Sequence, residues 1–218
     1  MKDFQAVVFD LDGTLADSLA DIADAMNRTL NRLSYPTYDY ETYKYFVGNG
    51  LKKLAFRAIP ENKRDDSHVE ECLTMMMEEY NKTCIDKTRL YDGIPELLHY
   101  LSEKGMKLNV LSNKADELTQ KITAVLLKDY SFEIILGASE QFPRKPSPES
   151  ALYIAQRNGI APEHFLYLGD TNVDMQTAVA AGMFPVGVTW GFRTREELQQ
   201  NGARLIIDHP EELISIIK

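Results

Sequence analysis

Two aspartates two residues apart, Asp10 and Asp12, end the apolar stretch VVFDLDGTL near the N-terminus. If that stretch is a strand, both carboxylates point to the same side of it. A second apolar run, FLYLGD, also ends in an acid, Asp170, and Asp174 follows four residues later. If both strands are central, four carboxylates meet at one sheet edge, where each pair at about 4 Å costs roughly 4 kcal/mol at an effective dielectric of about 20. A bound Mg²⁺ would offset this repulsion, since carboxylates together with a phosphate are its usual environment.

Turn chemistry is the main alternative for the first acidic pair, and for Asp12–Gly13 alone a turn is the better interpretation. The second acidic strand end supports a metal site independently. A calcium-binding EF-hand loop does not fit. Its sixth position requires glycine, which is Leu15 here, and a helix rather than a strand should precede it.

Strand-like and helix-like segments alternate along most of the chain. Short β-branched or aliphatic runs predict buried strands, namely AVVFD, MKLNVLS, FEIILGA, FLYLGD, PVGVTW and ARLIID. Helical patterns lie between most of these runs, for example Ile94, Leu97, Leu98 and Leu101 at helical spacing. Alternating strands and helices are typical of a parallel, doubly wound sheet, so we expect an α/β, Rossmann-like core.

The segment from about Ala16 to Cys84 breaks this alternation, because it contains no convincing strand. Two helical stripes of apolar residues run through it, first Leu19, Ile22, Ala23, Met26, Leu30 and Leu33, then Val69, Cys72, Leu73, Met76 and Tyr80. We therefore expect a small all-helical cap domain, residues 16–84, inserted after the first strand of a catalytic core made of residues 1–15 and 85–218. Such an insertion starts at the carboxyl end of a strand, where ligands bind in open α/β sheets, and is well placed to act as a lid.

The composition limits the expected partners and location. The net charge is −9, which argues against a non-specific nucleic-acid binder, because such a protein needs a basic stripe. The two cysteines, Cys72 and Cys84, lack the spacing of a metal site and are too few for a disulfide framework. The sequence shows no membrane-length apolar run and no signal-peptide pattern, so we expect a cytoplasmic protein, a monomer or homodimer, that acts on a small molecule.

Four motifs together give the chain a resemblance to a known family. DLDGT at Asp10–Thr14, LSN at Leu111–Asn113, the lysine of RKPSP at Lys145 and GDTNVD at Gly169–Asp174 occur in this order. They resemble the four motifs of the haloacid dehalogenase-like phosphohydrolases, specifically the phosphoglycolate phosphatase-like branch with a helical cap. The resemblance covers nearly the whole chain, and the four motifs in order are highly specific.

The resemblance implies roles for the aspartates. Asp10 would be the nucleophile that attacks phosphorus and forms an aspartyl-phosphate. Asp12 would protonate the leaving alkoxide and then act as base for the hydrolytic water, and crowding by acids would help it to keep its proton. Mg²⁺ would be held by the carboxylates of Asp10 and Asp170 and by the backbone carbonyl of Asp12, with Asp174 assisting directly or through water.

Further residues are expected to bind the phosphate. Ser112 supplies a hydroxyl at a strand end, and Asn113 and Lys114 supply backbone N–H groups at the start of a helix, whose dipole favours an anion. Lys145 would place a cation against the transferring phosphoryl group, and Thr14 of the first motif would join this set. Without the motif context, the serine and asparagine would fit a simple helix cap, and the lysine would fit a solvated surface charge.

A glycine-containing loop in the expected cap, Gly48, Asn49 and Gly50, could let the backbone approach a substrate. In the family a basic residue, commonly arginine, follows a similar loop, and the matching position here is Lys52. A cation there would suit a carboxylate substrate such as phosphoglycolate, although lysine lacks the bidentate geometry of arginine. The alternative is a plain helix–helix turn with Lys52 in solvent.

The resemblance therefore implies a Mg²⁺-dependent phosphomonoester hydrolase, a phosphatase, acting on a small anionic phosphate ester, with phosphoglycolate as the first candidate. A pyrophosphatase or a sugar-phosphate phosphatase would use the same residues. A β-phosphoglucomutase-like phosphomutase is the next alternative, although Thr14 favours a phosphatase. An inactive binding protein of the same fold is the last, and it would have no physical need for a costly acid cluster.

Overall fold

The computed structural model describes residues 3–217, and the chain divides into two compact units. The core unit runs up to Ala16 and resumes at Leu90, and the helical unit is Asp17–Arg89. Sequence reasoning places the second boundary at Cys84, whereas the structure places it after Arg89. Among the described residues, each helix is either too short or too polar to cross a lipid bilayer.

A parallel sheet forms the centre of the core unit. Within residues 3–217 it has six strands in the order β5-β4-β1-β6-β7-β8, and every neighbouring pair runs parallel. The strands are β1 (Ala6–Phe9), β4 (Lys107–Ala115), β5 (Phe132–Ala138), β6 (Phe165–Gly169), β7 (Phe184–Val188) and β8 (Leu205–Ile207). The chain first builds the sheet on one side of β1 and then on the other, which confirms the doubly wound α/β fold expected from the alternating pattern.

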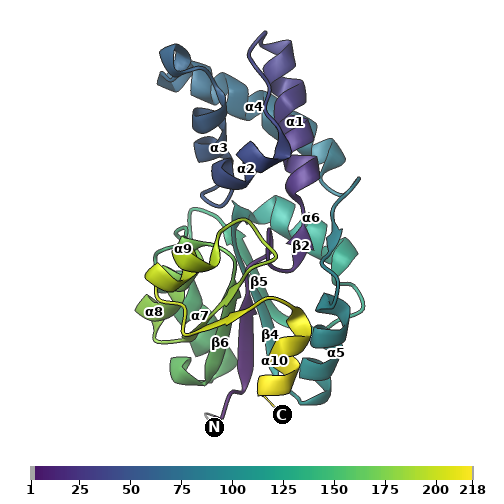
Figure 1. The fold of residues 1–218 in the computed structure, drawn as a ribbon, viewed down its shortest axis with the longest axis vertical. Coiled ribbons are helices and arrows are strands. Elements are labelled where there is room, and N and C mark those ends of the chain that lie inside the picture. The colour runs from purple at the N-terminus through teal and green to yellow at the C-terminus, as the bar shows by residue number, and fades with distance from the viewer. Residues whose placement is uncertain (1–2, 218) are drawn as a thin grey trace. The chain divides into compact units, whose positions relative to one another are not determined.

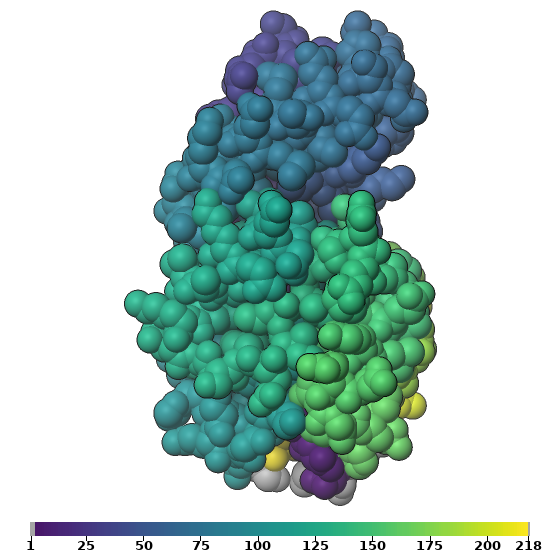
Figure 2. Space-filling model, turned by 180° about the vertical axis from the view of Figure 1, so that it is seen from behind, coloured from purple at the N-terminus to yellow at the C-terminus, as the bar shows by residue number. Residues whose placement is uncertain are grey.

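Helices cover both faces of this sheet. Figure 1 shows α7, α8 and α9 on one side of the strands and α5 and α10 on the other. The helices of the core unit are α5 (Ile94–Glu103), α6 (Asp116–Leu126), α7 (Glu149–Asn158), α8 (Asn172–Ala181), α9 (Arg195–Gln200) and α10 (Pro210–Ile216), with a 3₁₀ turn at Pro162–His164. From behind, segments coloured teal and green cover the core unit (Figure 2), and all four residues of β1 are 0% exposed.

The register of the central strands determines where the expected site residues lie. Phe9 pairs with Val110 of β4 and with Leu168 of β6. The backbone N–H of Asp10 then donates to Leu168 O at 3.0 Å. The residues that follow β1 and β6 therefore emerge at the same edge of the sheet, which is where open α/β sheets bind ligands.

The helical unit consists of α1 (Leu19–Arg32), α2 (Tyr40–Phe46), α3 (Leu51–Ala58) and α4 (Asp66–Thr83), with a 3₁₀ turn at Glu61–Lys63. Most of the two expected apolar stripes is buried between α1 and α4, including Ile22, Met26, Cys72 and Met76. At the two ends of the unit, β2 (Ala16–Asp17) and β3 (Arg89–Leu90) form a two-stranded sheet.

Asp21 explains why the helical unit extends to Arg89. Its buried carboxylate accepts hydrogen bonds from the backbone N–H groups of Lys87 at 2.9 Å and Thr88 at 2.8 Å, and from the Thr88 hydroxyl at 2.7 Å. These bonds attach the returning chain to α1. The sequence gives no local signal for them, because more than sixty residues separate the partners.

We predict that Asp21→Ala destabilises the protein by about 3 kcal/mol, because it leaves the buried N–H and hydroxyl of Thr88 and the part-buried N–H of Lys87 without this acceptor. Urea unfolding followed by circular dichroism measures this loss. Asp86→Ala, at an exposed position of the same segment, serves as the control and should change the free energy of unfolding by less than about 0.5 kcal/mol. Equal effects of the two substitutions would contradict this role of Asp21.

Candidate active site

Three aspartates form a buried cluster at the carboxyl edge of the sheet. Asp10 follows β1, Asp170 follows β6, and Asp174 lies in the first turn of α8. One carboxylate oxygen from each lies within 4.8 Å of the others, and all three residues are at most 6% exposed. The expected convergence of carboxylates therefore holds for these three, whereas the side chain of the fourth, Asp12, is directed elsewhere.

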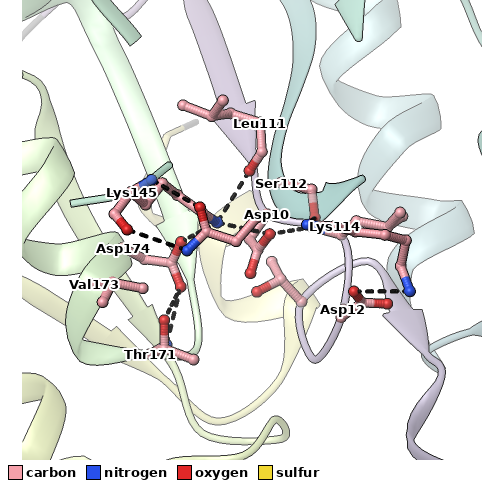
Figure 3. Close-up of polar contacts among 12 residues, drawn as sticks. Asp10, Asp12, Leu111, Ser112, Lys114, Lys145, Thr171, Val173 and Asp174 are labelled. Atoms are coloured by element: carbon pink, nitrogen blue, oxygen red, sulfur yellow. Dashed lines mark hydrogen bonds and ion pairs between the residues drawn. The ribbon is translucent and has the colours of Figure 1, made fainter. Parts of the chain in front are cut away.

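Lys145 supplies a buried cation to this cluster. Its Nζ lies 2.7 Å from Asp10 Oδ1 and 2.6 Å from Asp174 Oδ1, and it donates to Leu111 O at 3.1 Å. Only 2% of its side chain is exposed, so it is not a solvated surface charge. Figure 3 shows its ammonium between Asp10 and Asp174. One ammonium against three carboxylates leaves the cluster with excess negative charge when all of them are ionised.

This imbalance shifts the pKa values of the cluster. Burial, and then the charge of Asp174, raise the pKa of Asp10 well above its ordinary value, although Lys145 opposes the shift. Burial and Asp174 raise the pKa of Asp170 to about 7. Burial alone would lower the pKa of Lys145, but Asp10 and Asp174 outweigh it and raise that pKa.

Asp174 is fixed by the start of α8. Its Oδ2 accepts hydrogen bonds from the N–H and the hydroxyl of Thr171, the N-cap residue, in a capping box. Its Oδ1 contacts Lys145. The helix cap and the ion pair thus hold the two oxygens of this carboxylate in place.

A loop after β7 and the loop after β1 together hold Asp170. Thr14 donates its hydroxyl to Asp170 Oδ1 at 3.0 Å, and the N–H of Phe192 donates to Oδ2 at 2.9 Å. Trp190 donates its indole N–H to Thr14 O at 3.0 Å. Thr14, expected among the phosphate-binding residues, is fully buried, and its hydroxyl donates to an acid of the cluster. Trp190 thus joins the two loops.

Glycines allow the two loops to lie close to Asp170. An added Cβ at Gly191 would lie 2.3 Å from Asp170 Cβ and 2.3 Å from Gly13 O. At Gly13, whose φ of +87° already favours glycine, an added Cβ would lie 2.3 Å from Asp170 Oδ2. Any side chain at either position would push Asp170 out of place.

The end of β4 supplies the residues of the second motif. Asn113 accepts from Lys145 N at 2.7 Å and donates to Lys145 O at 3.2 Å, so its side chain positions the backbone of the lysine. Ser112 Oγ accepts from Lys114 N at 3.2 Å. The expectation that Asn113 and Lys114 open a helix is wrong, because β4 continues to Ala115, with a register shift against β5 after Leu111.

Asp12 and Lys114 form a separate ion pair. Lys114 Nζ lies 3.2 Å from Asp12 Oδ2, and 2% of the lysine side chain and 13% of the aspartate side chain are exposed. Figure 3 shows this pair to one side of the Asp10–Lys145–Asp174 group. The expected neighbours of Asp12 were other acids, whereas the structure places an ammonium beside it. Sequence reasoning considered only the backbone of Lys114, and only its position after LSN could have drawn attention to its side chain.

The expected specificity residues lie in the helical unit. Within the loop Gly48–Gly50, Asn49 Oδ1 accepts from Arg57 Nη2 at 2.8 Å, and Gly50, with φ of +85°, is the N-cap of α3. Lys52 of α3 forms an ion pair with Glu70 of α4, and about half of each side chain is exposed. Arg57 also binds the backbone that precedes the loop, so the loop conformation is well supported.

The acid cluster suits a hard divalent cation. Its possible ligand atoms are all carboxylate oxygens, which such cations prefer, and its excess negative charge would be neutralised by one. Asp10, Asp170 and Asp174 are therefore the residues that could hold a metal ion here.

The raised pKa of Asp170 predicts an unusual pH dependence for the metal-free protein. Between the ordinary value of 3.8 and about 7, the folded state holds a proton that the unfolded state has lost. Stability should therefore fall as pH rises through this window, by up to about 1.4 kcal/mol per pH unit. Urea unfolding in chelator at several pH values measures the slope. Asp170→Asn should reduce it, and an unchanged slope in that variant would contradict the assignment.

The close approach at Gly191 predicts a large cost for Gly191→Ala, about 3 kcal/mol or more, because the added Cβ meets backbone as well as Asp170. Gly159→Ala is the matched control. It has open space around the Cβ but a φ of +68°, so it should cost only about 1–2 kcal/mol of backbone strain. Thermal unfolding of both variants measures the two losses of stability. Equal losses would contradict the claim that an added Cβ is crowded at Gly191.

Comparisons with known proteins agree with the motifs and the geometry. A family model described as haloacid dehalogenase-like hydrolase matches residues 7–188. A phosphoglycolate phosphatase from Colwellia psychrerythraea is 32% identical to the chain, and the match covers 100% of this chain and 99% of the relative. One from Aquifex aeolicus is also 32% identical, and the match covers 98% of this chain and 96% of the relative. A solved structure from Lactobacillus delbrueckii is 31% identical with a TM-score of 0.93, covering 99% of this chain and 98% of its own. As its motifs predict, the chain belongs to the haloacid dehalogenase-like hydrolase family.

Proposed function

We propose that this chain is a Mg²⁺-dependent phosphatase that hydrolyses phosphoglycolate through a phosphorylated Asp10. Curated relatives named phosphoglycolate phosphatase are 30–32% identical to it and are matched over 96–99% of their lengths. The observation that carries the mechanism is the buried contact between Asp10 and Lys145 inside a cluster of three carboxylates.

Asp10 is the nucleophile in this proposal. Its Oδ1 accepts from Lys145 and from the N–H of Leu11, each at 2.7 Å, so the carboxylate is held in one orientation before substrate arrives. A bond forms from Asp10 to phosphorus while the bond from phosphorus to the ester oxygen breaks. Water then attacks the phosphorus, the bond to Asp10 breaks, and inorganic phosphate leaves.

Asp12 moves the protons of both steps. It lies two residues beyond the nucleophile, in a loop whose N–H groups at Gly13, Leu15 and Ala16 bond within the loop itself. In the first step its carboxyl group gives a proton to the departing alkoxide. In the second step its carboxylate accepts a proton from the attacking water and is restored.

The phosphoryl group meets donors from Lys145 and from the end of β4. Lys145 lies against Asp10, and Ser112 and Asn113 bring a hydroxyl and backbone N–H groups from the end of β4. Asp10 and Asp170 would hold the Mg²⁺ together with the backbone carbonyl of Asp12, and the ion would neutralise the phosphoryl oxygens as their charge develops. Asp174 would support the same ion.

We propose that the helical unit selects the substrate. The loop Gly48–Gly50 and Lys52 carry the N–H groups and the cation that a carboxylate-bearing ester would need. Lys52 would have to exchange Glu70 for the substrate carboxylate. The net charge of −9 supports a small-molecule substrate rather than a nucleic acid, and a cytoplasmic monomer or homodimer is part of the same proposal.

Phosphate release by the purified protein tests this function. We expect fast release from phosphoglycolate with Mg²⁺, no release in excess chelator, and at least about a 1,000-fold loss in Asp10→Asn. Asp129→Asn, at an exposed position of the core unit, is the control and should keep full activity. Mass spectrometry of acid-quenched enzyme should find the phosphoryl group on Asp10.

Parallel assays separate the alternatives. Faster release from pyrophosphate or from sugar phosphates would replace the proposed substrate and keep the chemistry. Isomerisation of β-glucose 1-phosphate without phosphate release would identify a phosphomutase. If no compound in the panel reacts, the proposal fails and a binding protein of this fold is the better interpretation.

A further inference from the structure

We infer that Lys114 is a positioning residue for Asp12, holding the carboxyl group that exchanges protons with the leaving group. The inference rests on the proposed phosphatase function. The Lys114 side chain has no part in the proposed mechanism so far. The pair spans 3.2 Å, between Lys114 Nζ and Asp12 Oδ2.

Burial indicates why a lysine occupies this position. An ammonium loses its hydration when it is buried, and a buried lysine needs a partner of opposite charge. The side chain of Lys114 is 2% exposed, and Asp12 provides a carboxylate for it. Another buried lysine, Lys145, contacts Asp10 and Asp174 instead. The two lysines thus serve different aspartates.

The backbone on both sides of the pair is fixed. Lys114 N donates to Ser112 Oγ at 3.2 Å, and Lys114 O accepts from the Thr119 hydroxyl at 3.3 Å. The loop of Asp12 is closed by a hydrogen bond of 2.9 Å from Gly13 N to Ala16 O. Because neither end moves easily, the ion pair restricts the rotation of the Asp12 side chain.

The two exposures indicate how Lys114 acts. Asp12, with 13% of its side chain exposed, is the more accessible partner, and Lys114 is the more deeply buried one. Lys114 therefore acts through Asp12 rather than on the substrate. The ammonium neutralises the carboxylate that is left after the proton has gone to the alkoxide.

The test compares two leaving groups. Phosphoglycolate releases an alkoxide that needs a proton, whereas p-nitrophenyl phosphate releases a nitrophenolate that departs without one. The ratio kcat/KM depends only on the steps up to and including departure of the leaving group, the alkoxide or the nitrophenolate. Acid catalysis contributes about 10²–10⁴-fold, so Lys114→Met should lose about 10- to 100-fold in kcat/KM for phosphoglycolate and less than about threefold for p-nitrophenyl phosphate.

Two further variants complete the design. Lys114→Arg keeps the positive charge and should recover much of the phosphoglycolate rate. Lys128→Met, which removes an exposed lysine of the core unit, should leave both rates unchanged. If Lys114→Met does not fold, Lys114→Gln carries the same expectation.

Each other outcome overturns the inference. Equal losses of kcat/KM on both substrates would indicate that Lys114 binds phosphate or is purely structural. Unchanged values of kcat/KM on both would show that Lys114 has no role in the reaction. A wild-type protein inactive on both compounds, in contrast, would refute the proposed phosphatase function on which the inference rests.

Discussion

The burial of three carboxylates beside a single ammonium is the constraint on which the rest of the site depends. Asp10, Asp170 and Asp174 lie within a few ångströms of one another at the edge of a parallel sheet, and Lys145 balances part of their charge. Repulsion at such distances amounts to several kcal/mol per pair in a protein interior. The cluster is stable only with retained protons or with a further cation, and the raised pKa values express the first of these possibilities.

Most of the surrounding structure keeps these charges in place. The register of β1 against β6 brings the first two acids together, and the cap of α8 fixes the third. Thr14, Trp190 and Phe192 hold Asp170 through two loops that lie far apart in the sequence. Asp12 is paired with Lys114 to one side of this cluster (Figure 3). In the proposed mechanism, this division lets Asp12 carry protons while the other three aspartates share a charge.

Strand ends and motif order allowed much of this site to be predicted from sequence. Apolar runs ending in Asp10 and Asp170 predicted the sheet, the edge and the convergence, because parallel strands end together. The long-range side-chain contacts could not be predicted in this way. No local sequence pattern indicates that Thr14 donates to Asp170 or that Lys114 contacts Asp12. The unit boundary at Arg89 depends in the same way on distant bonds to an aspartate of α1.

Calorimetric titration of the metal-free protein with Mg²⁺ tests most directly whether the acid cluster is a cation site. We expect one ion bound per chain, with at least about a tenfold loss of affinity in Asp170→Asn, because that variant removes a charged ligand from a buried set. An absence of binding by the wild-type protein, or an undiminished affinity in Asp170→Asn, would contradict the claim that this cluster is built around a divalent cation.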